Sequence, residues 1–372
     1  MTEAAFGAER RLCIYSQRAI RQDVSRCSGY EFEDVVASLE TASFAIPERG
    51  SDDALRYRAK RWLSKRTPLF TLAGSGARAA PLTSDFELFG AFLQKPLEIF
   101  ELDALPDWRR RSKMAFCVLE ELWDVTIDQF RPLVKSLDRF DLITCAFEDS
   151  CAPLAELTGR PVIHLPGAAD LMRFAPRALE TERPIDVYYM GRRRPELHEE
   201  IKAALEPRNG FYLHDSTTSP PIAADHTVHR DLLANLVRRS KIFMVDFGKI
   251  GHSDQKRGQT IWGPRHVEGL AGGAIQAGYA PDSEDYLRHF DWPEAVERLP
   301  EDPEAAAAVI LGLIDDPGEL ERRRRINLAQ ALRKHDWLHR WQLVLDHFGL
   351  PETPAMAERR SGLDALAAAA GG

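Results

Sequence analysis

Residues 185–205 read IDVYYMGRRRPELHEEIKAAL, and this stretch indicates the fold of the whole chain. Its apolar run at 186–190 predicts a buried strand, and the periodic run at 196–205 predicts a helix. Gly191 lies between them, where a residue without a Cβ lets the backbone turn sharply. A strand, a tight turn and a helix in this order are typical of parallel sheets with helices on both faces. The stretch therefore predicts an α/β protein.

Apolar runs and helical patterns also alternate on both sides of this stretch. In the first half they predict strands at residues 12–16, 43–47, 69–73, 97–102, 116–119, 142–147 and 161–165, with helices at 31–39, 53–64, 85–93, 127–137 and 152–157. In the second half they predict strands at 186–190, 211–214, 242–247, 274–277 and 296–299, with helices at 231–239 and 266–271. The pattern predicts two tandem Rossmann-like domains.

A proline-broken segment separates the two halves. It reads HLPGAADLMRFAPRALETERP, and its three prolines interrupt any regular element. We expect an N-terminal domain over 1–166 and a hinge at 167–184. The expected C-terminal parts are a second domain over 185–302, closing helices over 303–350 and a disordered, alanine-rich tail over 351–372.

Composition restricts the class of protein further. The chain has 372 residues, more than the roughly 250–300 at which single cores stop growing, and 44% of them are hydrophobic. Its formal net charge of −8 argues against general nucleic-acid binding, although local basic patches remain possible. The N-terminus has no secretory pattern, and no run of 18 apolar residues suggests a membrane span, so we expect a cytoplasmic protein. Five cysteines without C-x-x-C spacing indicate reduced thiols and imply no metal.

Ligands of open parallel sheets bind outside the carboxyl ends of the strands. Gly191 and Arg192 directly follow a predicted strand and precede a predicted helix. The glycine permits close approach of a ligand, the helix N-terminus favours an anion, and the arginine can hold a phosphate. A solvated basic turn is the alternative interpretation.

A second candidate segment runs from Asp246 to Tyr279. It reads DFGKIGHSDQKRGQTIWGPRHVEGLAGGAIQAGY and contains a long polar loop, which in a compact domain is usually functional. Arg265 and Glu268 lie three residues apart, so they share one face of a predicted helix. The carboxylate could accept hydrogen bonds from a diol, or it could be an ordinary acid of a first helical turn.

Three motifs in order resemble the GT-B glycosyltransferases. RHVEGLAGGAIQAGY, at 265–279, resembles their donor-binding region. HLPGAADLMRFAP, at 164–176, is similar to the hinge of the group-1 and spore-maturation-type enzymes, and IDVYYMGRRRPEL resembles the strand and turn that open their nucleotide-binding half. The resemblance covers residues 164–279.

The resemblance implies GT-B architecture: two Rossmann-like domains with a cleft between them and closing C-terminal helices. It implies an enzyme that transfers a sugar from a nucleotide-diphosphate sugar, held by the second domain, to an acceptor held by the first. Glu268 would bind the ribose, and Arg192, Arg265 and Arg257 would neutralise the diphosphate, with Gly191 and Lys256 completing the donor site. No metal and no cofactor beyond the donor are implied, and the acceptor stays unidentified.

Two departures leave an alternative open. The family often carries an earlier glutamate where this chain has Thr260, and the first predicted loop lacks a glycine pair. A catalytically silent scaffold that binds a nucleotide or a partner protein is therefore the second hypothesis. For an enzyme, acids after predicted strands are candidates for a general base. We assign Asp149 to that role; the other candidates are Glu120, Glu121, Glu148 and His164.

Overall fold

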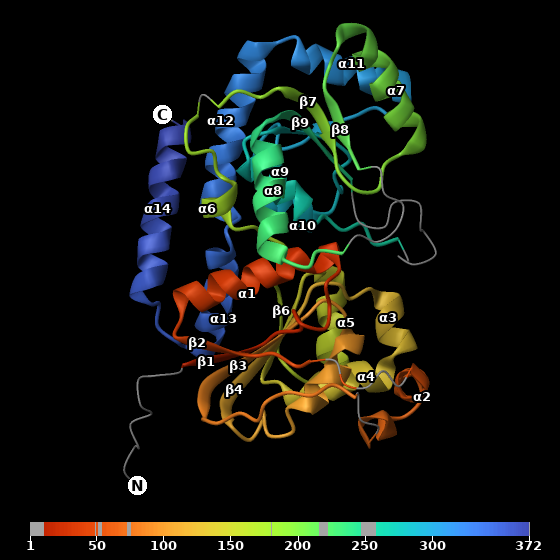
Figure 1. Cartoon of the computed structure of the whole chain (residues 1–372), viewed down its shortest axis with the longest axis vertical. Coiled ribbons are helices and arrows are strands. Elements are labelled where there is room, and N and C mark those ends of the chain that lie inside the picture. Colours follow the sequence, from red (N-terminus) through yellow and green to blue (C-terminus); the bar gives the residue numbers. More distant parts are fainter. Residues whose placement is uncertain are drawn as a thin grey trace. The chain divides into compact units, whose positions relative to one another are not determined.

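The computed structural model describes residues 11–48, 50, 54–72, 76–179, 181–215, 222–246 and 258–371. It divides into two compact units (Figure 1). The first holds the described residues up to 166 together with 258 and 259, and the second holds the others from 167 onward. Each unit contains one sheet in which every pairing is parallel. The predicted α/β class with two Rossmann-like units is therefore confirmed.

The first unit has a six-stranded sheet in the order β2-β1-β3-β4-β5-β6. The strands are β1 (Leu12–Tyr15), β2 (Ala42–Ala45), β3 (Phe86–Leu93), β4 (Ser112–Leu119), β5 (Leu142–Cys145) and β6 (Val162–His164). The α-helices are α1 (Cys27–Leu39), α2 (Ala54–Ser64), α3 (Asp124–Gln129), α4 (Arg131–Lys135) and α5 (Glu148–Thr158). All five cysteines lie in this unit as free thiols, and four of them are buried, as the sequence predicts.

Strand β3 corrects one sequence prediction. The apolar residues at 85–93 predict a helix, but this segment forms the strand between β1 and β4. Both of its faces are buried: Phe89 is fully inaccessible, and its neighbour Leu88, which points to the opposite face, is 1% exposed. Its pattern is therefore a continuous apolar run rather than an alternation. The strands predicted at 69–73 and 97–102 are also wrong, because the short 3₁₀ helices η2 (Pro68–Leu72) and η3 (Pro96–Ala104) form there.

The second unit has a five-stranded sheet in the order β11-β10-β9-β7-β8. Its strands are β7 (Ile185–Tyr189), β8 (Tyr212–His214), β9 (Ser240–Val245), β10 (Ile275–Gly278) and β11 (Glu297–Arg298), so all five strand predictions for this half are confirmed. The helices are α6 (Leu171–Phe174), α7 (Pro195–Leu205), α8 (His226–Arg238), α9 (Arg265–Ala271), α10 (Glu284–His289), α11 (Pro303–Ile314), α12 (Pro317–Lys334), α13 (Trp337–Phe348) and α14 (Pro354–Gly371).

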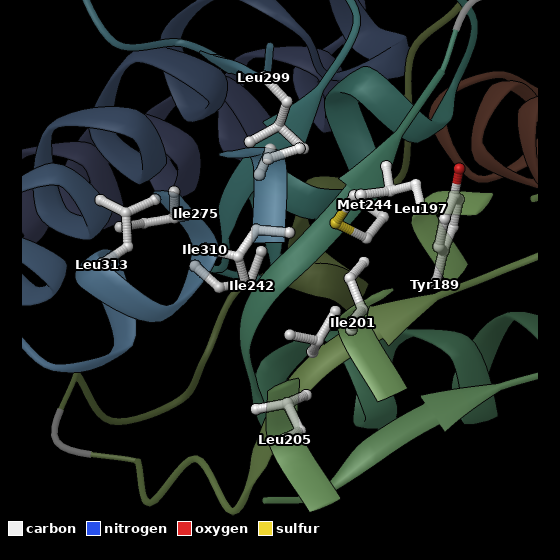
Figure 2. Packing of buried hydrophobic residues seen from close by; sticks show 13 residues of the cluster. Tyr189, Leu197, Ile201, Leu205, Ile242, Met244, Ile275, Leu299, Ile310 and Leu313 are labelled. Atoms are coloured by element: carbon white, nitrogen blue, oxygen red, sulfur yellow. The ribbon is translucent and has the colours of Figure 1, made fainter. Parts of the chain in front are cut away.

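One face of this second sheet packs on α7 and α11 (Figure 2). Tyr189 and Met244 project from β7 and β9, Leu197 from α7, and Ile310 from α11, and all are at least 97% buried. Burial of a large apolar side chain stabilises a fold by about 1.5–3 kcal/mol. This cluster therefore fixes the strand whose carboxyl end carries the Gly191 turn.

The tail corrects another expectation. The sequence predicts disorder over 351–372, but α14 forms there and packs along α12 (Figure 1). Met356, Leu363 and Ala367 are buried at helical spacing, so the alanine-rich composition hides an apolar stripe. Among the described residues, no helix is both long and apolar enough to span a membrane.

A buried carboxylate connects α14 to the rest of the second unit. Asp336, fully inaccessible at the start of α13, accepts hydrogen bonds from the backbone N–H groups of Leu171 (3.0 Å) and Leu338 (2.8 Å). Arg359 of α14 donates to the same carboxylate through Nε (2.8 Å) and Nη2 (2.7 Å). Its Nη2 also lies 2.6 Å from Oδ1 of Asp170, the N-cap of α6. One guanidinium thus joins three helices.

We predict that Arg359→Ala lowers the stability of the second unit by about 3–5 kcal/mol, because it leaves a buried carboxylate without its counter-charge. Arg360→Ala is the matched control, since the neighbouring arginine pairs with the more exposed Glu352 and should cost about 1 kcal/mol or less. Urea unfolding followed by circular dichroism measures both. Equal losses in the two variants would contradict this role for Arg359.

Candidate functional site

The turn after β7 places Gly191 at the carboxyl edge of the second sheet. Its φ of +78° is a left-handed conformation that favours glycine. Its backbone N–H donates to Oδ2 of Asp215, 2.6 Å away and directly after β8. This hydrogen bond joins the ends of two neighbouring strands, so the turn has a fixed geometry.

The guanidinium of Arg265 packs on the backbone of Gly191. A Cβ built on Gly191 would lie 2.5 Å from Nη2 of Arg265 and 3.0 Å from its Cζ. Nothing in the described part of the chain forms a hydrogen bond or ion pair with this guanidinium, which stays partly exposed. Two residues that the sequence assigns to one anion site therefore lie in contact. The guanidinium also interacts electrostatically with Asp246, whose pKa it lowers, without forming an ion pair with it.

The three consecutive arginines have different environments. Arg192 is exposed, and no described residue forms a hydrogen bond or ion pair with its side chain. Arg193 folds back, and its Nη1 donates to the carbonyl of Gly191 at 3.3 Å. Arg194 lies over the ring of Tyr279, with 3.2 Å between its Cζ and the ring centroid. Of the three, Arg192 thus has a side chain that forms no hydrogen bond or ion pair with a described residue.

Asp246, directly after β9, organises this edge of the sheet. Its Oδ2 accepts a hydrogen bond from the hydroxyl of Tyr189 (2.6 Å), and its Oδ1 lies 3.5 Å from Nε of Arg194. Burial raises the pKa of Asp246 above its ordinary value, against the opposing effects of Tyr189 and Arg194. No sequence motif gives this residue a role, although its position after a predicted strand was the signal that could have found it.

A pocket of about 230 Å³ adjoins the pair formed by Arg194 and Tyr279. The other lining residues come from the start of α7 and from the segment that precedes and opens α11. They are Glu196, Leu197, Glu301 and Pro303. The pocket combines an arginine, an aromatic ring and two acids, and it lies beside the cation-rich turn.

Glu268 lies deeper than a surface acid of a first helical turn. It is 3% exposed and forms an ion pair of 2.5 Å with Nη1 of Arg230, itself 2% exposed, on α8. The guanidinium of Arg230 also lies over the ring of Phe174, 4.8 Å from its centroid. The neighbouring His266 is completely buried, and burial lowers its pKa to about 4, so this imidazole is neutral. The proposed ribose contact of Glu268 stays a prediction.

The remaining predicted residues have different positions. Lys256 and Arg257 lie outside the described residues. Asp149 is exposed in the first turn of α5, directly after β5 in the first unit. His164, at the end of β6, has its Nε2 3.3 Å from the carbonyl of Ala146. The catalytic roles suggested for Asp149 and His164 stay predictions.

The carboxyl edge of the first sheet contains a cluster of acids. Glu33, in α1, accepts hydrogen bonds from Ser16 Oγ and from Nη2 of Arg18 (2.8 Å), and burial raises its pKa. Arg26, 1% exposed, pairs with Glu98 at 3.3 Å. Most charges at this edge are thus paired within the unit.

Glu120, directly after β4, differs from these paired acids. Its Oε1 packs on the first turn of α1, where a Cβ on Gly29 would lie 2.0 Å away. No hydrogen bond or ion pair to its carboxylate occurs among the residues that the structure describes. Burial raises its pKa to about 7; Arg26 opposes this shift, while Glu98, Glu33 and Glu121 add to it. A carboxyl that titrates near neutrality can both accept and return a proton.

Solved glycosyltransferase structures have the same fold. The Anabaena protein HepE, solved with UDP-glucose, has a TM-score of 0.53 at 12% identity over 91% of this chain and 99% of that chain. An α-glucosyltransferase solved with UDP and a 13-mer DNA has a TM-score of 0.54 at 11% identity, again over 91% and 99%. The UDP-forming α,α-trehalose-phosphate synthase from Burkholderia vietnamiensis has a TM-score of 0.52 at 12% identity, over 92% and 100%.

These neighbours are GT-B glycosyltransferases, and the chain has their fold: two Rossmann-like units over nearly the full length of each compared chain. No protein-family model and no curated protein sequence matches the chain. The resemblance drawn from three sequence motifs is therefore confirmed at the level of the fold.

We predict that Gly191→Ala destabilises the second unit by up to about 1 kcal/mol more than Gly349→Ala, which has a similar φ of +63° but no atom near its Cβ position. The extra cost is small because the displaced guanidinium is the end of a flexible side chain. Both variants carry the left-handed strain, and only Gly191→Ala displaces the guanidinium of Arg265. Thermal unfolding of the wild type, of Gly191→Ala, of Arg265→Ala and of the double variant measures the coupling free energy between the two positions. A coupling of zero would show that the two residues do not constrain each other.

We predict that Glu120→Gln stabilises the first unit above about pH 7 and changes its stability little near pH 4. A carboxyl whose pKa is raised in the folded state stabilises that state when protonated. This contribution is complete below its ordinary pKa of 4.5 and is lost as the pH rises through about 7. Glutamine remains neutral and avoids the loss. Melting temperatures from pH 4 to pH 8 test this, and parallel profiles for the two proteins would contradict it.

Proposed function

We propose that the protein is a glycosyltransferase that transfers a sugar from a nucleotide-diphosphate sugar to an acceptor. The observation that carries this proposal is the pair of cations, Arg192 and Arg265, beside Gly191 at the carboxyl edge of the second sheet, neither of which forms a hydrogen bond or ion pair through its guanidinium with a described residue. A diphosphate can approach the backbone closely at a glycine and can pair with both guanidinium groups. The shared GT-B fold supports the same assignment.

The chemistry proposed for this site is stabilisation of the leaving group. When the bond between the anomeric carbon and the diphosphate oxygen breaks, the oxygen retains the electron pair and negative charge develops on the diphosphate. Arg192 and Arg265 are cations that can stabilise this charge without a divalent metal. Tyr189 and Arg194 hold Asp246 beside the turn, and they act as positioning residues.

In an inverting reaction, the acceptor hydroxyl gives up its proton to a base as its oxygen bonds to the anomeric carbon. We propose Glu120 for this role in the first unit, because its unpaired carboxylate titrates near the pH at which a base is most effective. The exposed Asp149, assigned from the sequence, is the second candidate. In a retaining reaction, Glu120→Gln and Asp149→Asn would both stay active.

The proposed ribose ligand is Glu268. It lies one helical turn after Arg265 on α9, and its ion pair with Arg230 fixes the orientation of the carboxylate. A carboxylate held by one guanidinium still has lone pairs that can accept from ribose hydroxyls. Uridine nucleotides are the first donors to test, because HepE was solved with UDP-glucose and the α-glucosyltransferase with UDP.

We predict that UDP, GDP, dTDP or ADP raises the melting temperature, with about 2.7 kcal/mol of stabilisation at 100 times the dissociation constant. Arg192→Ala should weaken diphosphate binding by about 1.5–3 kcal/mol and affect the nucleoside much less, because only the diphosphate contacts the arginine. Titration calorimetry with nucleotide and nucleoside measures this difference.

Arg193→Ala is the matched control, because that side chain is already bonded to the carbonyl of Gly191. Equal losses in Arg192→Ala and Arg193→Ala would contradict the assignment. Slow release of nucleotide diphosphate from a sugar donor without acceptor separates an enzyme from a nucleotide-binding scaffold, which would bind the donor and release no product.

A further inference from the structure

A stretch in the first unit has an unusual charge pattern. Residues 54–84 contain seven arginines and lysines and no acid, in a chain whose net charge is −8. The stretch includes α2 and η2, which connect β2 to β3. Charged surfaces of soluble proteins commonly mix both signs. A stretch of 31 residues in which every charged side chain is positive therefore indicates a negatively charged partner.

Contacts with η3 determine which face of α2 is exposed. The ring of Tyr57 packs edge-on against Phe100, with 6.0 Å between centroids, and Phe70 of η2 packs on the same ring at 5.8 Å. Lys60 is 1% exposed and pairs with Asp103. The helix is therefore anchored through one face, and the opposite face points to solvent.

The exposed surface of α2 and of the residues that follow it as far as Leu69 carries four cations and two large apolar side chains. Trp62 is 56% exposed and Leu69 is 59% exposed, values far above those of ordinary core residues. The four cations are exposed and form no ion pair with any residue in the described ranges; they are Arg58, Arg61, Lys65 and Arg66. We call these six residues the basic patch.

Neighbouring side chains hold parts of the patch in place. The guanidinium of Arg66 lies 4.3 Å from the centroid of Trp62, and its Nη1 donates to the Trp62 carbonyl at 3.1 Å. Lys65 lies 4.7 Å from the ring centroid of Phe130, next to α4. Arg131, at the start of α4, is also exposed and adds positive charge near the patch.

We propose that the basic patch docks the protein on a lipid surface that contains anionic headgroups. The cations would pair with the headgroup phosphates, and Trp62 and Leu69 would enter the boundary between headgroups and acyl chains. A tryptophan beside several cations is the combination that binds at membrane interfaces. No helix of the described chain can span a bilayer, so this is peripheral binding.

Nucleic acid is a less suitable partner for this patch. Phosphate backbones need cations but not an exposed leucine, and stacking on single-stranded bases needs an open aromatic face. Arg66 already covers one face of Trp62. The docking goes beyond the proposed sugar transfer, and it can be measured without donor or acceptor.

The test is co-sedimentation of the full chain with phosphatidylcholine vesicles that contain or lack phosphatidylglycerol. We expect binding only to the anionic vesicles, with an affinity that decreases as the salt concentration rises. Each cation near an anionic surface contributes about fivefold. The variant Arg58→Gln/Arg61→Gln/Lys65→Gln/Arg66→Gln should therefore bind at least about a hundredfold more weakly. Trp62→Ala should lower the binding that remains at high salt.

The matched control removes four exposed cations elsewhere, in Arg110→Gln/Lys113→Gln/Lys202→Gln/Arg239→Gln, and should bind nearly as the wild type does. Unchanged melting temperatures verify that the variants fold. The pair Lys65→Gln/Arg66→Gln replaces the fourfold variant if that variant unfolds.

No binding to anionic vesicles, or an equal loss of binding in the control, would overturn the proposal. Binding to labelled DNA instead of vesicles would overturn it in favour of nucleic acid. Nucleotide binding measured on the same samples distinguishes this failure from a failure of the donor site.

Discussion

Parallel pairing of every strand in the two described sheets is the constraint on which both candidate sites depend. It places the carboxyl ends of neighbouring strands along one edge of each sheet, so residues distant in sequence become neighbours there. Gly191, Asp215, Asp246 and Tyr279 each follow a different strand of the second sheet, and three hydrogen-bonded or stacked contacts connect them to that edge. The site is therefore a consequence of topology.

The two edges differ in how their charges are balanced. In the first unit most charges are paired, as in the contacts of Glu33 with Arg18 and of Arg26 with Glu98, and Glu120 keeps an unpaired carboxylate that burial holds near neutrality. In the second unit the guanidinium groups of Arg192 and Arg265 form no ion pair with a described residue, and the nearest compensation is the electrostatic interaction of Arg265 with Asp246. An edge whose cations form no ion pairs suits an anionic donor, and an edge with a titratable acid suits an acceptor hydroxyl.

Local patterns predicted the elements whose environment is simple. The strand at Ile185–Tyr189 and its glycine turn follow from a short apolar run and a missing Cβ. Strand β3 could not be predicted in this way, because burial on both faces removes the alternation that distinguishes a strand from a helix. The helix α14 was missed because small residues at helical spacing bury little area each, and its anchor is the long-range contact of Arg359 with Asp336.

For the candidate site, the sequence indicated which residues lie at the carboxyl edge of the second sheet. It did not indicate which of their side chains form hydrogen bonds or ion pairs within the protein. RRR at 192–194 is uniform as a sequence, yet Arg194 is the N-cap of α7, with Pro195 fixing the next φ, so its side chain turns back over Tyr279 and toward Asp246. Arg193 is held by the carbonyl of Gly191, and only Arg192 extends beyond the turn. Identical side chains therefore differ in their contacts: Arg193 and Arg194 are held at the edge, and Arg192 is exposed without a described partner. These different contacts depend on Asp246 and Tyr279, which follow β9 and β10. Both residues are distant from 192–194 in the sequence, so no local sequence pattern could predict the contacts.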